Sequence, residues 1–383
     1  GNSTARGSMH LDLIGGVLRR DALCAAERKK RQGKQRTNGR WWRLPLPPEI
    51  TAVLHQASKV QPSARTLGDL ILAAGLDHES CQHLLNDGFP TSHRPEDARF
   101  SSSFRTCLLD LDVHPALVAR TSGDPTTTPL SDHFYLTFTT HQVHEVMVRF
   151  CNWAGLTPPK QPPIERTIGS PKALCLKDFQ SLVQCLNQKV ISARNQVTSR
   201  SSITEVIEFH NLYTKAFALQ IILAHGGRGN LIGRMTFGRL FASDQYLALS
   251  DRRTDPYSRQ RTLPLTAVFA EGNGRYREHL DAMSKRMLPH SADESIALKN
   301  ISRGKQLHSC AFLIYSESED GWTQRSLKRS DLVELLTKLG RGIGKVFDHE
   351  SLNIGRHFWQ TTLVNKQVSQ PAIEAFLGHH TNG

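Results

Sequence analysis

The sequence predicts a mainly helical protein of the α+β class: an N-terminal helical domain, then a mostly helical domain with a small β-hairpin or sheet. Two observations predict this class. Apolar residues recur at helical spacing in most segments, whereas Tyr246–Leu249 and Thr262–Leu265 have the character of two strands joined by a polar turn. The chain has 383 residues, 38% of them hydrophobic, which suits about two domains with a buried core.

The composition argues against a transmembrane protein and against a disulfide-stapled domain. No apolar run reaches about 18 residues, and the longest, Ala216–Ala224, is interrupted by Gln220. The seven cysteines are scattered without a Cys-x-x-Cys pair, so we expect free thiols in a reducing cytoplasm. The sequence has no signal-peptide pattern, and residues 1–8 have the character of a cloning remnant ahead of Met9.

The formal net charge of +13 is concentrated near the N-terminus, where ten basic and two acidic residues lie between Arg19 and Arg43. We interpret residues 9–44 as a basic arm that is mobile when free and neutralises nucleic-acid phosphates when bound. A solvated tail is the alternative interpretation. The absence of an accompanying apolar helical face argues against membrane binding. The expected phosphate contacts are Arg28, Lys29, Lys30, Arg31, Lys34 and Arg36.

Residues 45–157 predict a helical domain. Apolar spacing indicates helices between Glu49 and about Asp87, over Leu108–Val118 and over His141–Trp153. Residues 88–105 are rich in Ser, Pro and Arg and predict a loop. Prolines then cluster around residues 158–170, which we interpret as a linker between two domains.

Residues 171–383 predict the second domain. Helical stripes run from Phe179 to Leu186 and from Val206 to Leu223, and Gly226-Gly227 is a natural stop for the second stripe. The predicted hairpin follows. Three later helices are predicted over Leu332–Leu339, with Ser330 as N-cap and Asp331 in the first turn, over Arg356–Val364, and over Pro371–Leu377 before Gly378.

Three basic side chains at predicted helix ends are the candidates for chemistry, because common enzyme motifs are absent. Arg228 follows a helix stop, Arg356 lies at a helix start, and His379 follows a helix end. Guanidinium groups fixed in this way can bind phosphate oxygens in bidentate fashion. Unrelated surface arginines and a capping histidine are one alternative. A metal at His357, His379 and His380 is another, although no carboxylate or Cys lies near them in sequence.

Four motifs together resemble the catalytic domain of the tyrosine recombinase (phage integrase) family over about residues 170–383. They occur in the family's order and at roughly its separations. The four motifs are Gly227-Arg228, the hairpin that ends in Arg259-Gln260-Arg261-Thr262-Leu263-Pro264-Leu265, the helix of Asn353–Leu363 and Leu377-Gly378-His379. By position, residues 45–157 correspond to the family's core DNA-binding domain.

The resemblance implies a site-specific DNA recombinase that exchanges strands through a 3′-phosphotyrosyl intermediate, without metal or cofactor. Arg228 and Arg356 would clamp the scissile phosphate, His379 would hydrogen-bond it, and Arg259 and Arg261 would contact DNA. The implied partners are double-stranded DNA and further copies of the chain in a synaptic tetramer, and a monomer is compatible with a chain that lacks the nucleophile. The implied location is a bacterial-type cytoplasm, associated with the nucleoid.

The sequence departs from the family's pattern at three points. Asn353 stands where the family usually has His or Lys, and the hairpin has no lysine, with Arg252 or Arg253 in its neighbourhood. No tyrosine follows Tyr315, so the chain contains no nucleophile at the family's position, and we expect it beyond residue 383. Without it, the chain is expected not to cleave DNA. The alternatives are a non-catalytic DNA-binding relative, a type IB topoisomerase-like enzyme and an RNA-binding protein with a basic arm.

Overall fold

The computed structural model divides the chain into two compact units, Gly1–Pro171 and Lys172–Gly383, which are described separately. The residues that the structure describes are 9–12, 17–21, 41–63, 83, 97–122, 136–160, 167–170, 173–229, 232, 235–240, 246–250, 260–305, 310–319, 321–347 and 349–378.

The first unit begins with a three-stranded antiparallel sheet of β1 (Met9–Asp12), β2 (Val17–Asp21) and β3 (Trp41–Pro45), in that order. These strands lie within the segment predicted to be a mobile arm, so both ends of that segment form regular structure. The register explains the difference, because Leu18 on β2 lies opposite Leu11 on β1 and Leu44 on β3. Aligned apolar pairs stabilise a sheet even in a strongly basic sequence. Residues 22–40, with most of the charge, lie outside the described residues.

The remaining elements of this unit are helices and one short two-stranded sheet. Leu108, Val118 and Val146 form its small core, where the Phe104 and Phe150 rings meet edge to face at 4.7 Å. Helix α5 begins at Asp97, so the predicted loop over 88–105 is wrong at its C-terminal end. The elements are α2 (Pro48–Val60), α5 (Asp97–Asp110), α6 (Pro115–Ser122), β4 (Thr137–Thr139), α8 (Thr140–Ala154) and β5 (Thr167–Gly169), which pairs with β4.

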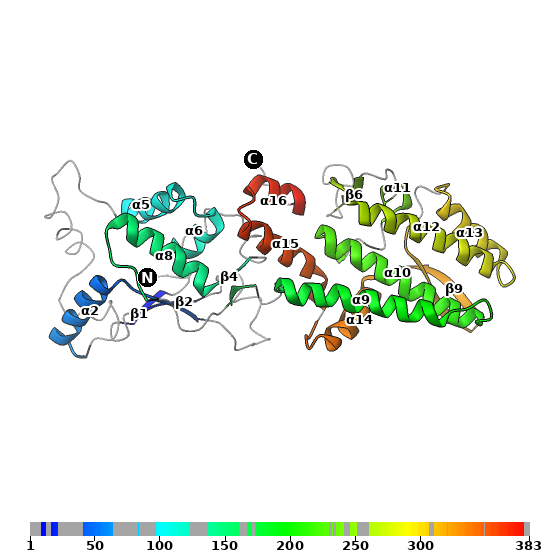
Figure 1. Ribbon diagram of the computed structural model, residues 1–383, viewed down its shortest axis with the longest axis horizontal. Helices are drawn as coiled ribbons and strands as arrows, with labels where there is room; N and C mark the ends of the chain where they lie inside the picture. Colours follow the sequence, from blue (N-terminus) through cyan, green and yellow to red (C-terminus); the bar gives the residue numbers. More distant parts are fainter. Residues whose placement is uncertain are drawn as a thin grey trace. The chain divides into compact units, whose positions relative to one another are not determined.

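The second unit is a helical assembly with two hairpins (Figure 1). Helices α9 and α10 run side by side, as do α12 and α13. Its helices are α9 (Leu176–Gln196), α10 (Ile203–His225), α11 (Phe237–Leu240), α12 (Ala267–Met287), α13 (Ala292–Ser302), α14 (Arg329–Gly342), α15 (Ile354–Asn365) and α16 (Gln370–Leu377), with a 3-10 turn at His349–Asn353. Its hairpins are β6 (Tyr246–Ser250) with β7 (Gln260–Pro264), and β8 (Leu313–Ser318) with β9 (Gly321–Ser326).

Helix α10 is the centre of this unit. It packs against α9, α12, α14, α15 and β8, so its apolar residues cover nearly its whole circumference rather than one stripe. A capping box starts it: Ser202 Oγ accepts from Glu205 N at 3.3 Å, and Ser202 N donates to Glu205 Oε2 at 2.7 Å.

The mainly helical α+β class predicted from the sequence is confirmed. The sequence pattern missed α12, whose glycines at 272 and 274 interrupt the helical signal, and the β8–β9 hairpin. In the described part of the chain, no helix is long and apolar enough to cross a membrane.

The predicted cap of α14 is wrong. The helix begins at Arg329 after Lys328, so Ser330 lies inside it. Asp331 closes this end instead, because its Oδ2 accepts from Lys328 N at 2.8 Å and its carboxylate binds Arg325 through two 2.8 Å bonds. Burial alone would raise the pKa of Asp331, but the bonds to Arg325 and Lys328 lower it.

A buried pair of imidazoles joins α10 to α12 and β8. His210 Nε2 lies 2.9 Å from the Leu313 carbonyl oxygen and must donate to it, because that oxygen only accepts. His210 Nδ1 therefore accepts from His279 Nε2 at 3.0 Å. Both side chains are neutral in this arrangement, and burial lowers the pKa of His210 to about 4 and that of His279 well below its usual range.

We predict that this pair makes the second unit acid-sensitive. The unfolded state binds protons on these imidazoles below about pH 6.5 and the folded state does not, so stability is full above that pH and falls as the pH approaches the folded pKa. The loss for His210 alone is on the order of 3 kcal/mol. Urea unfolding of the chain at several pH values between about 7 and 4 measures it.

The double variant His210→Gln/His279→Phe is the comparison. Its unfolding free energy should depend less steeply on pH over the same range, with a residual slope from His225, whose pKa burial also lowers. An unchanged slope in this variant would contradict the assignment.

Candidate functional site

The C-terminal end of α10 is the point where two of the second unit's candidate residues, Arg261 and Arg356, bind the same carbonyl oxygen. Gly226 adopts a left-handed backbone conformation (φ 58°), and the Gly227 N–H returns to Ile222 O at 3.0 Å, which closes the helix. Such an end leaves carbonyl oxygens that need donors. Leu223 O accepts from Trp359 Nε1 at 2.8 Å. Gly226 O accepts from Arg356 Nη1 at 2.9 Å and from Arg261 Nη2 at 3.2 Å.

Gly355 allows α15 to approach this end of α10. A Cβ atom at this position would lie 2.9 Å from both Ile222 O and Leu223 O, closer than real Cβ contacts. The absence of a side chain therefore sets the distance between the two helices. This distance lets the next residue, Arg356, reach the Gly226 carbonyl.

Arg356 is completely enclosed, with 0% of its side chain exposed. Besides Gly226 O, its guanidinium binds the Leu377 carbonyl at the end of α16 through Nη2. Both acceptors lie at helix C-terminal ends, where the helix dipole favours a positive charge. Arg356 thus joins the ends of α10 and α16. Its acceptor Gly226 lies 130 positions before it in the sequence, and Leu377 lies 21 positions after it.

Arg261 makes the matching connection from the hairpin. The sequence predicts a DNA contact for this residue, but its side chain is only 6% exposed. Successive side chains of a strand point to opposite faces, so Arg261 and Leu263 share the buried face and Thr262 lies on the exposed one. Its Nη1 donates to Phe376 O and its Nη2 to Gly226 O. Burial first, and also the nearby Arg261 charge, lower the pKa of His225.

Arg228 follows Gly226 by two residues and is partly exposed. Its Nε atom is buried and has no hydrogen-bond partner among the residues that the structure describes. Asn353, the N-cap of α15, is also partly exposed, and its side chain makes no capping bond. Both residues therefore border the junction without closing it, and a partly exposed guanidinium can bind a phosphate from solvent.

The remaining predicted residues lie outside the described part of the chain. Gly378, with φ 65°, ends α16 and immediately precedes His379 in the sequence, and His379 itself is not described. The roles proposed for the following residues stay predictions: His379, Arg252, Arg253, Arg259, Arg28, Lys29, Lys30, Arg31, Lys34 and Arg36.

Tyr315, the last tyrosine of the chain, is built into the core. It is 2% exposed, and its hydroxyl accepts from Gln324 Nε2 at 3.1 Å. Burial raises its pKa, with a further contribution from the Glu294 charge. An enclosed phenol that resists ionisation is unsuited to attack a DNA phosphate.

Sequence reasoning missed what Gly355, Arg261 and Trp359 do at the junction. Two signals could have indicated it: a glycine directly before the second arginine, and an arginine two residues before Leu263 on a predicted strand, where both side chains share one face.

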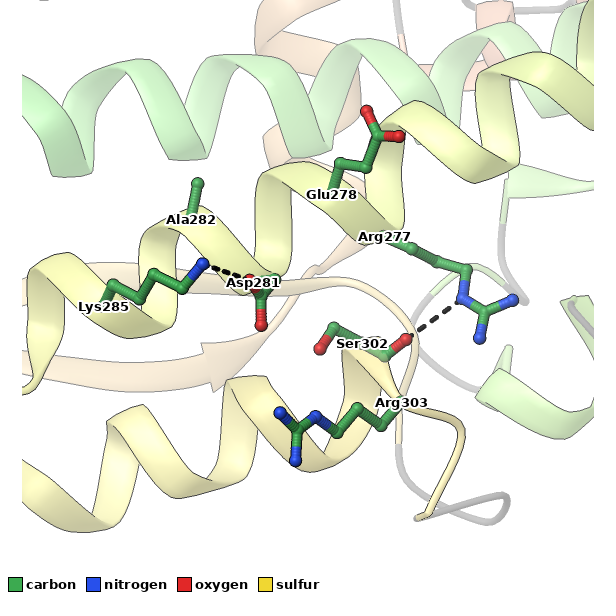
Figure 2. A pocket seen from close by; sticks show the side chains of 7 residues that line it. All are labelled: Arg277, Glu278, Asp281, Ala282, Lys285, Ser302 and Arg303. Atoms are coloured by element: carbon green, nitrogen blue, oxygen red, sulfur yellow. Dashed lines mark hydrogen bonds and ion pairs between the residues drawn. The ribbon is translucent and has the colours of Figure 1, made fainter.

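A shallow groove between α12 and α13 is a second surface feature, with a volume of about 370 Å³ (Figure 2). Three basic side chains, Arg277, Lys285 and Arg303, face two acidic ones, Glu278 and Asp281. Lys285 Nζ pairs with Asp281 Oδ2 at 2.7 Å, and Arg277 Nε donates to the neutral Ser302 O at 3.0 Å. The acidic side chains in the lining offset most of its positive charge and oppose the binding of a phosphate. Its lining residues are Arg277, Glu278, Asp281, Ala282, Lys285, Ser302 and Arg303. Among the described residues, no cluster of three His, Cys, Asp or Glu side chains could hold a metal ion.

Comparisons with known proteins find a weak likeness to solved structures and no match in sequence. No family model matches the chain, and no curated protein matches it. The crystal structure of XerA recombinase is similar over 81% of this chain and 86% of that chain, with 11% sequence identity and a TM-score of 0.33. A likeness of this size assigns neither a family nor an activity.

We predict that replacing Arg356 and replacing Arg228 have very different effects on the free energy of unfolding. Arg356→Ala removes a fully enclosed side chain and its bond to Leu377 O, and should cost roughly 2–5 kcal/mol. Arg228→Ala, at a partly exposed position, should cost less than about 1 kcal/mol. Urea unfolding of both variants measures the difference, and equal costs would contradict this description of the junction.

We also predict that Gly355→Ala destabilises the second unit by about 1–3 kcal/mol, because its Cβ would push α15 away from two carbonyl oxygens of α10. Gly274→Ala is the matched control. It lies in α12 with nothing within 4 Å of the added Cβ, and should stabilise by about 0.5–1 kcal/mol. Thermal unfolding of both variants tests the pair, and a neutral Gly355→Ala would show that the helices can separate freely.

Proposed function

We propose that this chain is the DNA-binding and catalytic body of a site-specific DNA recombinase of the tyrosine recombinase kind. The observation that carries the proposal is the convergence at one junction of motifs that are far apart in sequence. The ends of α10 and α16, the start of α15 and strand β7 meet through Arg261 and Arg356. The motifs at these four places are the ones that resemble the family. Chance arginine motifs would not be expected to meet in this way.

In this proposal the partner is duplex DNA, bound mainly through its phosphates by the basic N-terminal segment and by the second unit. Arg228 binds non-bridging oxygens of the scissile phosphate, and His379 donates to the same group. Arg356 and Arg261 bind Gly226 O, two residues before Arg228, and in this proposal their positive charges stabilise the five-coordinate transition state. Asn353 supplies a further hydrogen bond but cannot shuttle a proton.

The chemical step is a transfer of the phosphoryl group. A tyrosine oxygen attacks phosphorus and loses its proton, the bond to the 5′-oxygen breaks, and that oxygen leaves as a protonated hydroxyl. A 5′-hydroxyl from a second strand then attacks the 3′-phosphotyrosyl group, and the tyrosine leaves with a proton. The phosphoester energy is kept throughout, so neither ATP nor metal is needed. The tyrosine would come from a segment beyond residue 383 or from another protein copy.

A non-catalytic DNA-binding relative is the second candidate. One observation favours it: backbone carbonyls enclose Arg356, which has no exposed surface for a phosphate. Such a protein would keep the fold and the duplex contacts without cleaving DNA.

We predict that the chain selects a specific sequence from a pool of randomised duplexes, and that it activates the phosphate there. The assay supplies the missing nucleophile as hydrogen peroxide and places a 5′-bridging sulfur at each position of the selected site in turn. Attack by peroxide oxygen forms a P–O bond, breaks the P–S bond and releases the sulfur as a thiol, and a denaturing gel detects the broken strand. Arg228→Ala should lower this rate at least about 100-fold. The affinity for the duplex should fall less than about tenfold.

The outcomes separate the candidates. Specific binding with no thiol release above the protein-free rate, at any position, would favour the non-catalytic relative. Equal binding to single-stranded RNA or DNA would contradict both. Arg303→Ala, in the groove between α12 and α13, removes a positive charge away from the junction; it is the control variant and should leave the rate unchanged.

A further inference from the structure

The contacts of Arg261 give it a role different from the DNA contact that its motif suggests. We propose that Arg261 is a positioning residue: its guanidinium locks the C-terminal end of α16 to the C-terminal end of α10. The lock fixes the spacing between the segments that carry Arg228 and His379. The catalytic meaning of this lock rests on the proposed function, because only that function directs these two residues at one phosphate.

The bonds of Arg261 span three elements. The residue lies on β7, its Nη2 donates to Gly226 O at the end of α10, and its Nη1 donates to Phe376 O at the end of α16. The second bond joins residues 115 positions apart in the sequence. With 6% of its side chain exposed, Arg261 has little surface left for a DNA phosphate.

Each bonded carbonyl lies close in sequence to a candidate site residue. Arg228 follows Gly226 by two residues, and His379 follows Leu377, the neighbour of Phe376, by two residues. Few rotatable bonds separate Gly226 from Arg228 and Phe376 from His379. A displacement of either carbonyl would therefore also displace the candidate residue that follows it. Arg356 holds the same two helix ends through Gly226 O and Leu377 O, so the two arginines act on the junction as a pair.

A guanidinium suits this position better than an ammonium group. Its planar fork directs two N–H groups at two separate oxygens at once, whereas a lysine carries its donors on a single nitrogen. Arg261→Lys keeps the positive charge and the buried length but cannot reproduce both bonds. The variant therefore separates the geometric role of Arg261 from its charge.

Arg286 provides a matched control. Its Nη1 donates to Ser199 O at 3.0 Å and its Nη2 to Thr198 O at 2.7 Å, so it also joins two carbonyls through one guanidinium. These carbonyls precede the start of α10, and a helix of 23 residues places them about 34 Å from its other end. Arg286→Lys thus removes the same kind of bond far from the junction.

The experiment measures hydrogen exchange of the intact chain, with Arg261→Lys, Arg261→Met and Arg286→Lys as variants. In both Arg261 variants, amides of α16 (Gln370–Leu377) should exchange at least about tenfold faster, the factor for one lost charged hydrogen bond. Arg286→Lys should leave α16 unchanged. Unchanged exchange of α16 in Arg261→Lys, the variant that keeps the fold's charge, would overturn the lock whatever the protein's function is.

The peroxide assay then tests the catalytic meaning. In Arg261→Lys the rate constant at saturating duplex should fall at least about tenfold, while the Kd for DNA and its salt dependence stay unchanged. A weaker Kd with a salt slope lowered by about one would instead make Arg261 a phosphate contact and overturn the positioning role. If the unmodified chain releases no thiol, the proposed function and the catalytic meaning of the lock fail together, and the exchange data alone decide the lock.

Discussion

The arrangement of the second unit depends on how one helix ends. Helix α10 is buried along most of its length, so its C-terminal carbonyls cannot rely on water and must find donors within the protein. Trp359, Arg356 and Arg261 supply them from α15 and β7. Because the two arginines also bind the end of α16, satisfying one helix terminus fixes three other elements around it.

Two of the donors at the end of α10, Arg356 and Arg261, are positively charged, although neutral donors would satisfy the same carbonyl oxygens. A carbonyl oxygen satisfies a guanidinium N–H without cancelling the positive charge, so each bond of Arg261 and Arg356 keeps that charge inside the fold. Burying a guanidinium is costly unless its hydrogen bonds are made. The fold bears this cost at Gly226, two residues before the partly exposed Arg228, and the same bonds hold this part of the backbone rigid.

The sequence predicted the helical class, the stop of α10 and the β6–β7 hairpin, because apolar periodicity and glycine punctuation are local signals. It did not predict the strands β1–β3, in which β2 pairs with residues of β3 that lie 20 (Asp21 and Trp41) to 28 (Val17 and Pro45) positions away, nor the start of α5. For the site, sequence order indicated that Arg228 and Arg356 matter. It did not show which atoms Arg356 and Arg261 bind, because their acceptors are backbone carbonyls that carry no residue-type signal.

The difference between Arg228 and Arg356 follows from where each lies relative to the same glycine. Arg228 continues the chain beyond Gly226 and is partly exposed, whereas Arg356 approaches Gly226 from α15 and is enclosed. Two arginines with similar motif contexts therefore differ in their surroundings: Arg228 is partly open to solvent, and Arg356 holds the surrounding backbone in place. Any group that took the place of the Leu377 carbonyl at Arg356 would remove a bond that holds the end of α16. A second bond, from Arg261 to Phe376 O, holds the same helix end, so the position of α16 depends on both arginines together.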